Sequence, residues 1–333
     1  MLAHSLITPK PAEEKPFFLT ERPIPIPGAG QVRLRVQACG VCHTDLHIAE
    51  GDIHPPQLPI TPGHQVVGTV DALGAEVDGM QPGDLVGVPW LHSACGACDF
   101  CRRGEENLCP QARFTGYHVP GGFADYMLAE GRYVLPIPKG IDAVQAAPLL
   151  CAGIIGYRSL RKAELQPGER LGLIGFGASA HLALQVAREW GCEVYVFTRA
   201  ETHRRHARQL GAAWAGGIED GKQARLLDRA VIFAPAGNLI PLTLAKIRPG
   251  GTLAVNAIHM SPIPEMAYGL LYGERTLRSV ANATYQDGVE FLDMAGRIPL
   301  TATVARYPFS AANQALLDLK HSKISGEAVL CMV

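Results

Sequence analysis

Residues 171–187, LGLIGFGASAHLALQVA, contain the pattern that decides the fold of the second half of the chain. An apolar run is followed by Gly175-Phe-Gly177-Ala-Ser-Ala180, and the residues after it place apolar side chains at helical spacing. Strand, glycine turn and helix in this order are the context of a dinucleotide-binding fingerprint, in which alanine is accepted at the third glycine position. The alternative is an ordinary turn between a strand and a helix.

Such a fingerprint binds the cofactor pyrophosphate at the helix N-terminus, where free N–H groups and the helix dipole attract negative charge. The expected contacts are Gly175, Gly177, Ala178 and Ala180. The next apolar run, 193–198, ends without the Asp or Glu that NAD-binding proteins use for the ribose 2′-hydroxyl. The residues there that can bind a 2′-phosphate are Thr198, Arg199 and Arg204. The sequence therefore favours NADP(H), with NAD(H) as the second choice, unless these arginines only solubilise a helix face.

The two halves of the chain differ in their hydrophobic pattern. Further apolar runs at 230–234 and 252–258 alternate with helical segments, which predicts a parallel sheet built from βαβ units. In the first half, apolar and polar residues alternate within 31–37, as in a half-buried strand, and Gly and Pro turns are frequent. We expect an α/β protein in which residues 153–297 form the dinucleotide-binding domain. A β-rich domain is expected from 1–152 together with 298–333.

Composition excludes several classes of protein. Of the 333 residues 47% are apolar and 18% are charged, which is incompatible with a disordered chain. A net charge of −1 without a basic stripe argues against a nucleic-acid partner. We find neither a run of about 20 apolar residues for a membrane span nor a signal peptide, so we expect a cytoplasmic protein. Nine cysteines in such a chain favour metal ligands or reactive thiols over disulfides.

The strongest local motif is a cluster of four cysteines, Cys95, Cys98, Cys101 and Cys109. Four thiolates at this spacing suit one tetrahedral Zn²⁺, and they leave no ligand position open. We therefore expect a structural zinc in a lobe spanning about 92–112, whose folding depends on the metal. An iron–sulfur cluster and two disulfides are the alternatives.

A second group of thiols is ambiguous on spacing alone. Cys39 and Cys42 form a CxxC pair, which fits a redox dithiol, half of a zinc site or two buried thiols. His64 follows a Pro-Gly turn, and Cys151 lies in an apolar segment. Taken singly, these two residues fit a loop histidine and a core thiol.

Taken together, these segments resemble one known family. The motifs ACGVCHTDLH (38–47), TPGHQVVG (61–68), the four-cysteine cluster, LLCAG (149–153) and GFGASA (175–180) occur in the order found in zinc-dependent medium-chain alcohol dehydrogenases. The chain is similar to that family over essentially its whole length. The resemblance implies a GroES-like catalytic domain with a Rossmann domain inserted before its last segment. It also implies a homodimer or homotetramer.

The resemblance assigns roles to the residues of these motifs. Cys42, His64 and Cys151 would bind a catalytic zinc and leave a fourth position for water or substrate, so that each subunit binds two zinc ions. Asp45 would fix the tautomer of His64. Thr44 would bind the alcohol oxygen, His47 would pass the proton to solvent, and His43 would meet the pyrophosphate. For His43 and His47 the alternative is a solvated pair.

Two further positions bear on the substrate and the metal. Trp90 resembles the pocket tryptophan of microbial members and would favour primary alcohols, unless it only packs in the core. Gln65 stands where the family usually has Glu behind the metal, and the loss of that charge should leave zinc slightly more electrophilic. Glu327 stands where an Arg that touches the pyrophosphate is often found, so cofactor affinity would be weaker.

The sequence thus predicts a zinc-dependent oxidoreductase that interconverts small-molecule alcohols and aldehydes or ketones with a nicotinamide cofactor. A zinc-free quinone or enoyl reductase of the same fold and a non-enzymatic zinc- and nucleotide-binding protein are the alternatives. The remaining cysteines are expected to be buried thiols: Cys39, Cys192 and Cys331.

Overall fold

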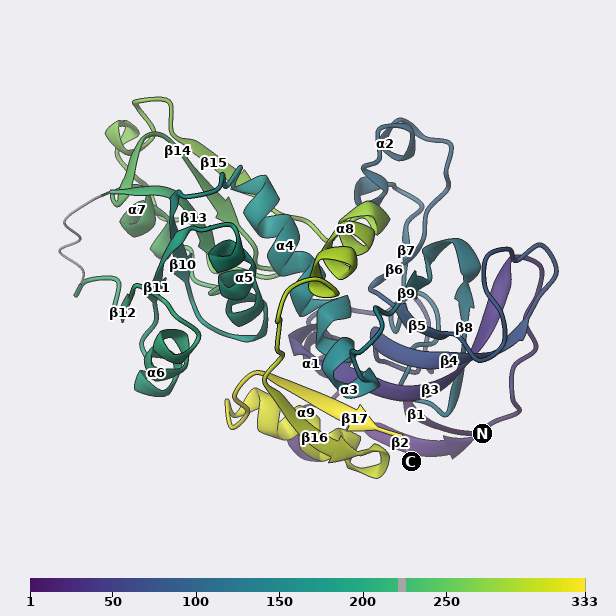
Figure 1. Ribbon diagram of the computed structural model, residues 1–333. Helices are drawn as coiled ribbons and strands as arrows, with labels where there is room; N and C mark the ends of the chain where they lie inside the picture. Colours follow the sequence, from purple (N-terminus) through teal and green to yellow (C-terminus); the bar gives the residue numbers. More distant parts are fainter. Residues whose placement is uncertain (221–225, 333) are drawn as a thin grey trace. The chain divides into compact units, whose positions relative to one another are not determined.

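The chain forms two compact units in the computed structural model, which describes residues 1–220 and 226–332 (Figure 1). Unit 1 consists of Met1–Ile154 and Asn282–Val333, and unit 2 consists of Ile155–Ala281. One stretch of unit 1 therefore comes from each end of the sequence.

Unit 2 is built on a six-stranded parallel sheet with strand order β12-β11-β10-β13-β14-β15. This is the doubly wound order 3-2-1-4-5-6 of dinucleotide-binding domains, and it confirms the expected α/β class. The central strands are buried on both faces, which explains their continuous apolar sequences. The strands are β10 Arg170–Ile174, β11 Glu193–Phe197, β12 Trp214–Gly216, β13 Leu227–Ile232, β14 Ile247–Val255 and β15 Thr276–Ser279. The helices are α5 Ala178–Glu189, α6 Glu201–Gln209 and α7 Leu239–Leu244, with α4 Ala152–Lys162 spanning the boundary between the units.

Unit 1 is built on a seven-stranded sheet with order β16-β17-β3-β4-β5-β9, in which β8 also pairs with β3. Along β3 (Gln31–Val41) buried and more exposed residues alternate as far as Gln37, as the sequence predicted. From Ala38 onward every residue is buried, because β17 pairs with this end and α9 packs on β3. The other strands of the sheet are β4 Gln65–Leu73, β5 Leu85–Val88, β8 Tyr126–Glu130, β9 Leu135–Pro136, β16 Val304–Pro308 and β17 Glu327–Cys331. Two small sheets pair β1 Leu2–Leu6 with β2 Phe17–Glu21, and β6 Leu91–Ser93 with β7 Arg113–Phe114.

The C-terminal segment joins the first domain, but earlier in the chain than residue 298. We expected 282–297 in the dinucleotide-binding domain, whereas the structure places these residues in unit 1. The cause is the packing of α8 (Tyr285–Ala295) on unit 1, where a Cβ on Gly288 would lie 2.7 Å from Cδ1 of Leu135 and the hydroxyl of Tyr285 donates to the carbonyl of Val134 at 3.3 Å. In Figure 1 the yellow β17 lies beside the purple β3, although they come from opposite ends of the sequence. Val333, the last residue of the expected terminal strand, lies outside the described residues.

The helices of unit 1 are short. They are α1 His43–Glu50, α2 Asp99–Arg102, α3 Ala143–Ala146, α8 and α9 Ala312–Lys320. In the described part of the chain no single helix has the length and apolar character to cross a bilayer, and one bent pair, Ala143–Leu150 with Ala152–Lys162, meets that test jointly by length and composition only.

Candidate metal and cofactor sites

Three residues from separate parts of unit 1 converge on one point. The ligand atoms of Cys42, His64 and Cys151 all lie within 4.8 Å of one another. Cys42 follows β3 and caps α1, His64 precedes β4, and Cys151 follows a 3-10 turn, Ala147–Leu150. We call these three residues the dispersed centre.

The imidazole of His64 is oriented for metal binding. Its Nε2 lies 3.2 Å from Sγ of Cys42, and its Nδ1 lies 3.3 Å from Oδ1 of Asp45. Asp45 is fully buried and also accepts hydrogen bonds from the backbone N–H groups of Cys42 and Gly63, at 3.0 and 3.1 Å. One carboxylate therefore fixes the imidazole and connects the two chain segments that hold the first two ligands.

The three groups of the dispersed centre shift one another's protonation. A hydrogen bond from Cys151 lowers the pKa of Cys42 well below its usual range, and the same bond raises that of Cys151 well above its usual range. Burial lowers the pKa of His64, but Cys42 and Asp45 outweigh it and raise that pKa well above its usual range. Two adjacent thiolates repel each other, so both sulfurs ionise only with positive charge between them. A divalent metal held by two sulfurs and one imidazole meets this requirement, and the donor set suits zinc.

The predicted substrate and proton-transfer residues lie along α1, next to Cys42. The backbone N–H of Thr44 donates to the Cys42 sulfur at 3.3 Å. His43 is exposed in the first turn of α1. One turn later, Nδ1 of His47 lies 2.8 Å from Oδ2 of Asp52, a partner that the sequence analysis did not identify. Asp52 lies beyond the end of α1, and no motif pointed to it.

Trp90 lies beside the dispersed centre. Its ring makes an edge contact with His64 at 4.9 Å between centroids and stacks on Phe114 at 5.0 Å. Its indole N–H donates to Oδ1 of Asn282 at 3.1 Å. Trp90 thus packs against the core and also faces the ligand histidine. The sequence analysis missed Phe114 and Asn282, because their contacts with Trp90 join distant segments and leave no local pattern.

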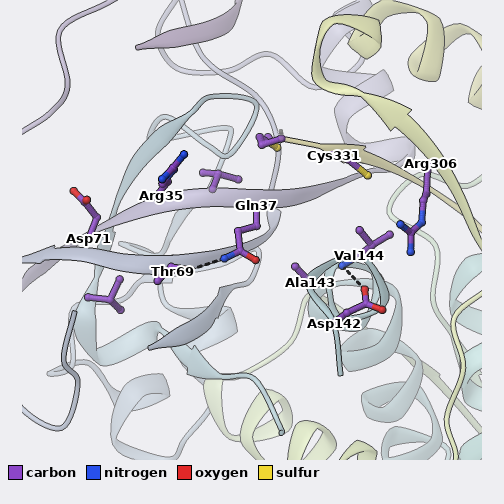
Figure 2. A pocket seen from close by; sticks show the side chains of 12 residues that line it. Arg35, Gln37, Thr69, Asp71, Asp142, Ala143, Val144, Arg306 and Cys331 are labelled. Atoms are coloured by element: carbon purple, nitrogen blue, oxygen red, sulfur yellow. Dashed lines mark hydrogen bonds between the residues drawn. The ribbon is translucent and has the colours of Figure 1, made fainter. Parts of the chain in front are cut away.

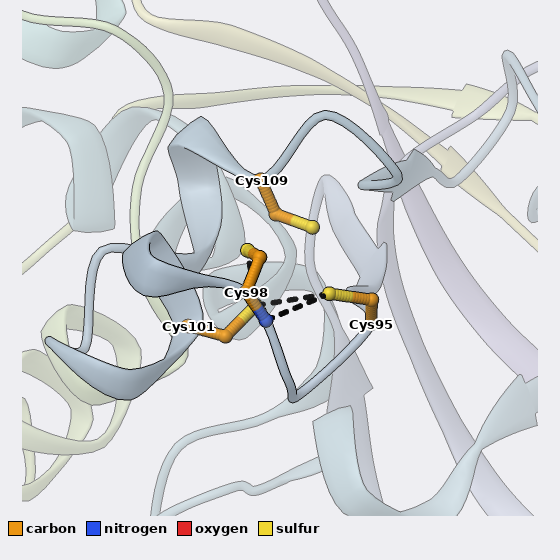
Figure 3. Close-up of side chains that lie close together, drawn as sticks. All are labelled: Cys95, Cys98, Cys101 and Cys109. Carbon is orange, nitrogen blue, oxygen red and sulfur yellow. Dashed lines mark hydrogen bonds between the residues drawn. The ribbon is translucent and has the colours of Figure 1, made fainter.

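The four-cysteine cluster lies in the lobe between β6 and β7, which we call the four-cysteine lobe (Figure 3). Its four sulfurs lie within 4.8 Å of one another, and Sγ of Cys101 is 3.5 Å from that of Cys98 and 3.8 Å from that of Cys95. A tetrahedral zinc with Zn–S bonds of about 2.3 Å separates its sulfurs by about 3.8 Å. The backbone N–H groups of Ala97 and Cys98 lower the pKa of Cys95 to about 6, whereas burial and Cys98 raise that of Cys101 to about 12. The geometry suits a closed four-sulfur metal site.

The remaining cysteines form no disulfide within the described chain. Cys39 and Cys192 are buried as expected, whereas Cys331 is only half-buried. Cys331 borders a cavity of about 910 Å³ that is lined by residues of β3, β4, β16 and β17 and by the start of α3 (Figure 2). Arg35 and Arg306 also line it, and none of the predicted catalytic, cofactor or metal residues does.

The predicted cofactor fingerprint forms the turn between β10 and α5 in unit 2. Gly175 has a φ of +87°, and a Cβ there would lie 2.9 Å from the backbone nitrogen of Ala234, so only glycine fits. Gly177 is the N-cap of α5, Ala178 is its first residue, and Ala180 is fully buried. The start of the helix is thus presented by small residues, as pyrophosphate binding requires.

At the end of β11 the predicted phosphate-binding residues differ in their surroundings. Arg199 is exposed. Arg204 donates to the carbonyl of Thr198 at 2.9 Å and lies at ion-pair distance from Glu201 and Asp220, 3.8 and 3.5 Å. Arg204 is therefore already committed to local contacts, and Arg199 is the better candidate for a 2′-phosphate.

Comparison with known proteins agrees with these features. Residues 28–139 match the alcohol dehydrogenase GroES-like domain family. Over 336 aligned residues, 99% of this chain and 97% of the relative, the chain is 43% identical to a probable alcohol dehydrogenase, AdhA, of Mycobacterium tuberculosis. An alcohol dehydrogenase of Moraxella sp. is 35% identical, with 94% of this chain and 95% of the relative covered. A solved cinnamyl alcohol dehydrogenase of Sorghum bicolor aligns with a TM-score of 0.90 at 29% identity, covering 99% of this chain and 97% of that one.

These relatives extend over nearly the entire chain, so they bear on both units. The expected GroES-like catalytic domain is confirmed by the match over 28–139, and the parallel sheet of unit 2 by its strand order. The chain belongs to the zinc-type medium-chain alcohol dehydrogenases, oxidoreductases that interconvert alcohols with aldehydes or ketones.

Proposed function

We propose that this protein interconverts primary alcohols and aldehydes by hydride transfer to or from a nicotinamide cofactor, with a catalytic zinc bound by Cys42, His64 and Cys151. The observation that supports this most directly is the convergence of two sulfurs and one imidazole from three distant segments. A bound zinc with one open position would lower the pKa of an alcohol or polarise an aldehyde carbonyl.

The surrounding residues would position the reactants and move the proton. The hydroxyl of Thr44, two residues after a ligand, would hydrogen-bond the substrate oxygen and would pass on its own proton as it takes up that of the substrate. His47 would accept the relayed proton and release it to solvent, with its ring oriented by Asp52 at 2.8 Å. Asp45 would keep Nε2 of His64 directed at the metal by facing Nδ1 at 3.3 Å.

The wall formed by Trp90 supports the preference for primary alcohols. An indole in edge contact with His64 at 4.9 Å limits the space beside the metal on that side. A secondary alcohol adds a branch at the reacting carbon, so it should fit less well than its primary isomer. Steady-state kinetics with matched isomers tests this, and a higher kcat/KM for the secondary isomer would overturn it.

For the cofactor we propose NADP(H), with His43 contacting the pyrophosphate. The support is the exposed guanidinium of Arg199 at the end of β11, in a position where NAD-binding proteins place a carboxylate. The ratio of kcat/KM with NADP to that with NAD measures the preference. A tenfold preference for NAD would contradict the assignment.

We also propose that the protein self-associates as a dimer or tetramer and acts in the cytoplasm. Before the edge strand β15, the residues Ile258, Ile263, Tyr268 and Tyr272 are exposed by 53–74%. A second copy could cover this apolar surface. Light scattering coupled to gel filtration measures the assembly, and a monomer would contradict it.

The function is tested by counting zinc ions per subunit and assaying a panel of alcohols with each cofactor. Two zinc ions and alcohol oxidation are expected. Turnover of quinones or enones by protein without zinc at the dispersed centre would favour the alternative reductase. Cofactor binding without any turnover would favour a non-enzymatic role.

A further inference from the structure

Two unusual residues form a buried pair behind the dispersed centre. Gln65 and Glu327 are almost entirely inaccessible to solvent, with exposed fractions of 0% and 2%, and Nε2 of Gln65 donates to Oε1 of Glu327 at 2.7 Å. The sequence analysis treated them as unrelated departures, one at the metal and one at the pyrophosphate. In the structure they are partners.

The strand register explains how they meet. Gln65 on β4 and Glu327 on β17 lie on either side of β3, where Gly40 pairs with Gln65 and Val41 pairs with Ala328. A Cβ on Gly40 would lie 2.8 Å from Cδ of Gln65, so the missing side chain lets the glutamine cross β3 towards Glu327.

The same register places the pair next to two metal ligands. Gln65 directly follows His64 in the sequence. Continuing the β17–β3 pairing by one residue from Ala328 and Val41 sets Glu327 opposite Cys42. Burial raises the pKa of Glu327 well above its usual range and Cys42 raises it further, while the hydrogen bond from Gln65 and the charge of His64 lower it. The register and the 2.7 Å hydrogen bond therefore set the carboxyl group beside the segments that hold Cys42 and His64.

Among the described residues the pair has no ion-pair partner, although the charge of His64 lowers the pKa of Glu327. Oε2 of Glu327 and Oε1 of Gln65 are buried without a hydrogen-bond partner. Over residues 1–220 and 226–332, no lysine, arginine or histidine forms a salt bridge with Glu327. A buried carboxyl group is stable as an anion only beside positive charge. A divalent ion in the dispersed centre would supply that charge.

We infer that Glu327 is a positioning residue for the catalytic zinc: its carboxylate, held by Gln65, increases retention of the metal by Cys42, His64 and Cys151. The inference rests on the proposed zinc site. Gln65 lacks the negative charge that the family usually has directly after the ligand histidine. Glu327, at the start of β17, supplies a negative charge in its place.

The test is the rate at which zinc leaves the full-length protein in excess chelator. E327Q keeps the size of the side chain and can still bond Gln65, but removes the charge. Partners outside the ligand set typically affect metal affinity 10- to 100-fold, so one zinc should leave at least about tenfold faster while the zinc of the four-cysteine lobe is unaffected. In cobalt-substituted protein, the absorption bands of the dispersed centre should shift.

As a matched control, E130Q alters a half-buried glutamate that accepts a hydrogen bond from Gln31 on β3. This variant should release zinc at the wild-type rate.

A charge swap separates electrostatics from packing. Q65E/E327Q keeps one carboxylate and one amide and exchanges their places, so it should retain zinc like the wild type. The inference is overturned if E327Q retains zinc as well as the wild type, or if the folded swap loses zinc as fast as E327Q. If E327Q does not fold, a swap that folds but loses zinc faster than the wild type also overturns it. Failure of the proposed function looks different: the wild-type protein would then bind no zinc at the dispersed centre.

Discussion

The four-cysteine lobe and the dispersed centre are built in opposite ways. The lobe takes its ligands from one short stretch, and its helix α2 has no buried residue. The dispersed centre takes its ligands from three segments that are already ordered by the sheet of unit 1, and Asp45 and His64 are almost fully buried there. Metal in the lobe would replace a missing hydrophobic core, whereas metal in the dispersed centre would be added to a core that exists without it.

This difference predicts that loss of metal has different consequences at the two centres. Removing it from the dispersed centre should abolish chemistry and leave the fold intact. Removing it from the lobe should loosen the lobe while the ligands of the dispersed centre stay in place.

The largest effect is expected for Cys151→Ser in the dispersed centre. Loss of one thiolate ligand should remove one zinc. It should reduce kcat/KM by roughly 10³-fold or more, because the metal would stabilise the transition state by several kcal/mol. Metal analysis and alcohol kinetics measure this, and circular dichroism should be unchanged because the turn at 147–150 is buried without the metal. Unfolding of unit 1 in this variant would contradict the comparison.

The matching change in the lobe is Cys101→Ser. It should also remove one zinc, but its main effect should be local opening between β6 and β7, with hydrogen exchange at least about a hundredfold faster there. Exchange in β3 and β4 should stay at the wild-type rate. If activity disappears while exchange in the lobe is unchanged, the lobe is not held together by its metal.

The same difference explains what the sequence could reveal. Four cysteines at short spacing identify the lobe without any other knowledge, and alternating apolar runs identify the parallel sheet of unit 2. The ligands Cys42, His64 and Cys151 are distant in the chain, so only resemblance to a family joined them. The pairing of Gln65 with Glu327 depends on the register of three strands, which no local pattern specifies. Residues 282–297 were assigned to the other unit for a similar reason: the amphipathic helix α8 fits either unit until the contact of Gly288 with Leu135 is known.

Asp45→Asn sharpens the comparison by acting on the dispersed centre without touching a ligand. Asparagine can still accept one hydrogen bond from the backbone of Cys42 or Gly63, but it no longer faces His64 with a charge. Zinc affinity at the dispersed centre should fall about 10- to 100-fold, measured by chelator competition. The zinc of the lobe serves as the internal control, and equal loss of both ions would show that the effect is general destabilisation.

The smallest effect is expected where the dispersed centre meets its aromatic wall. Asn282 has a φ of +54° and accepts the indole N–H of Trp90, so Asn282→Gly keeps that backbone conformation and removes only the acceptor. One hydrogen bond contributes about 1 kcal/mol, so the ratio of kcat/KM for primary over secondary alcohols should fall about fivefold, with both zinc ions retained. Asn282→Asp retains an acceptor oxygen and should behave like the wild type. If the glycine variant keeps the wild-type ratio of kcat/KM for primary over secondary alcohols, the indole of Trp90 is held by its stacking on Phe114 and its contact with His64. In that case Trp90 is part of the core that exists before the metal binds.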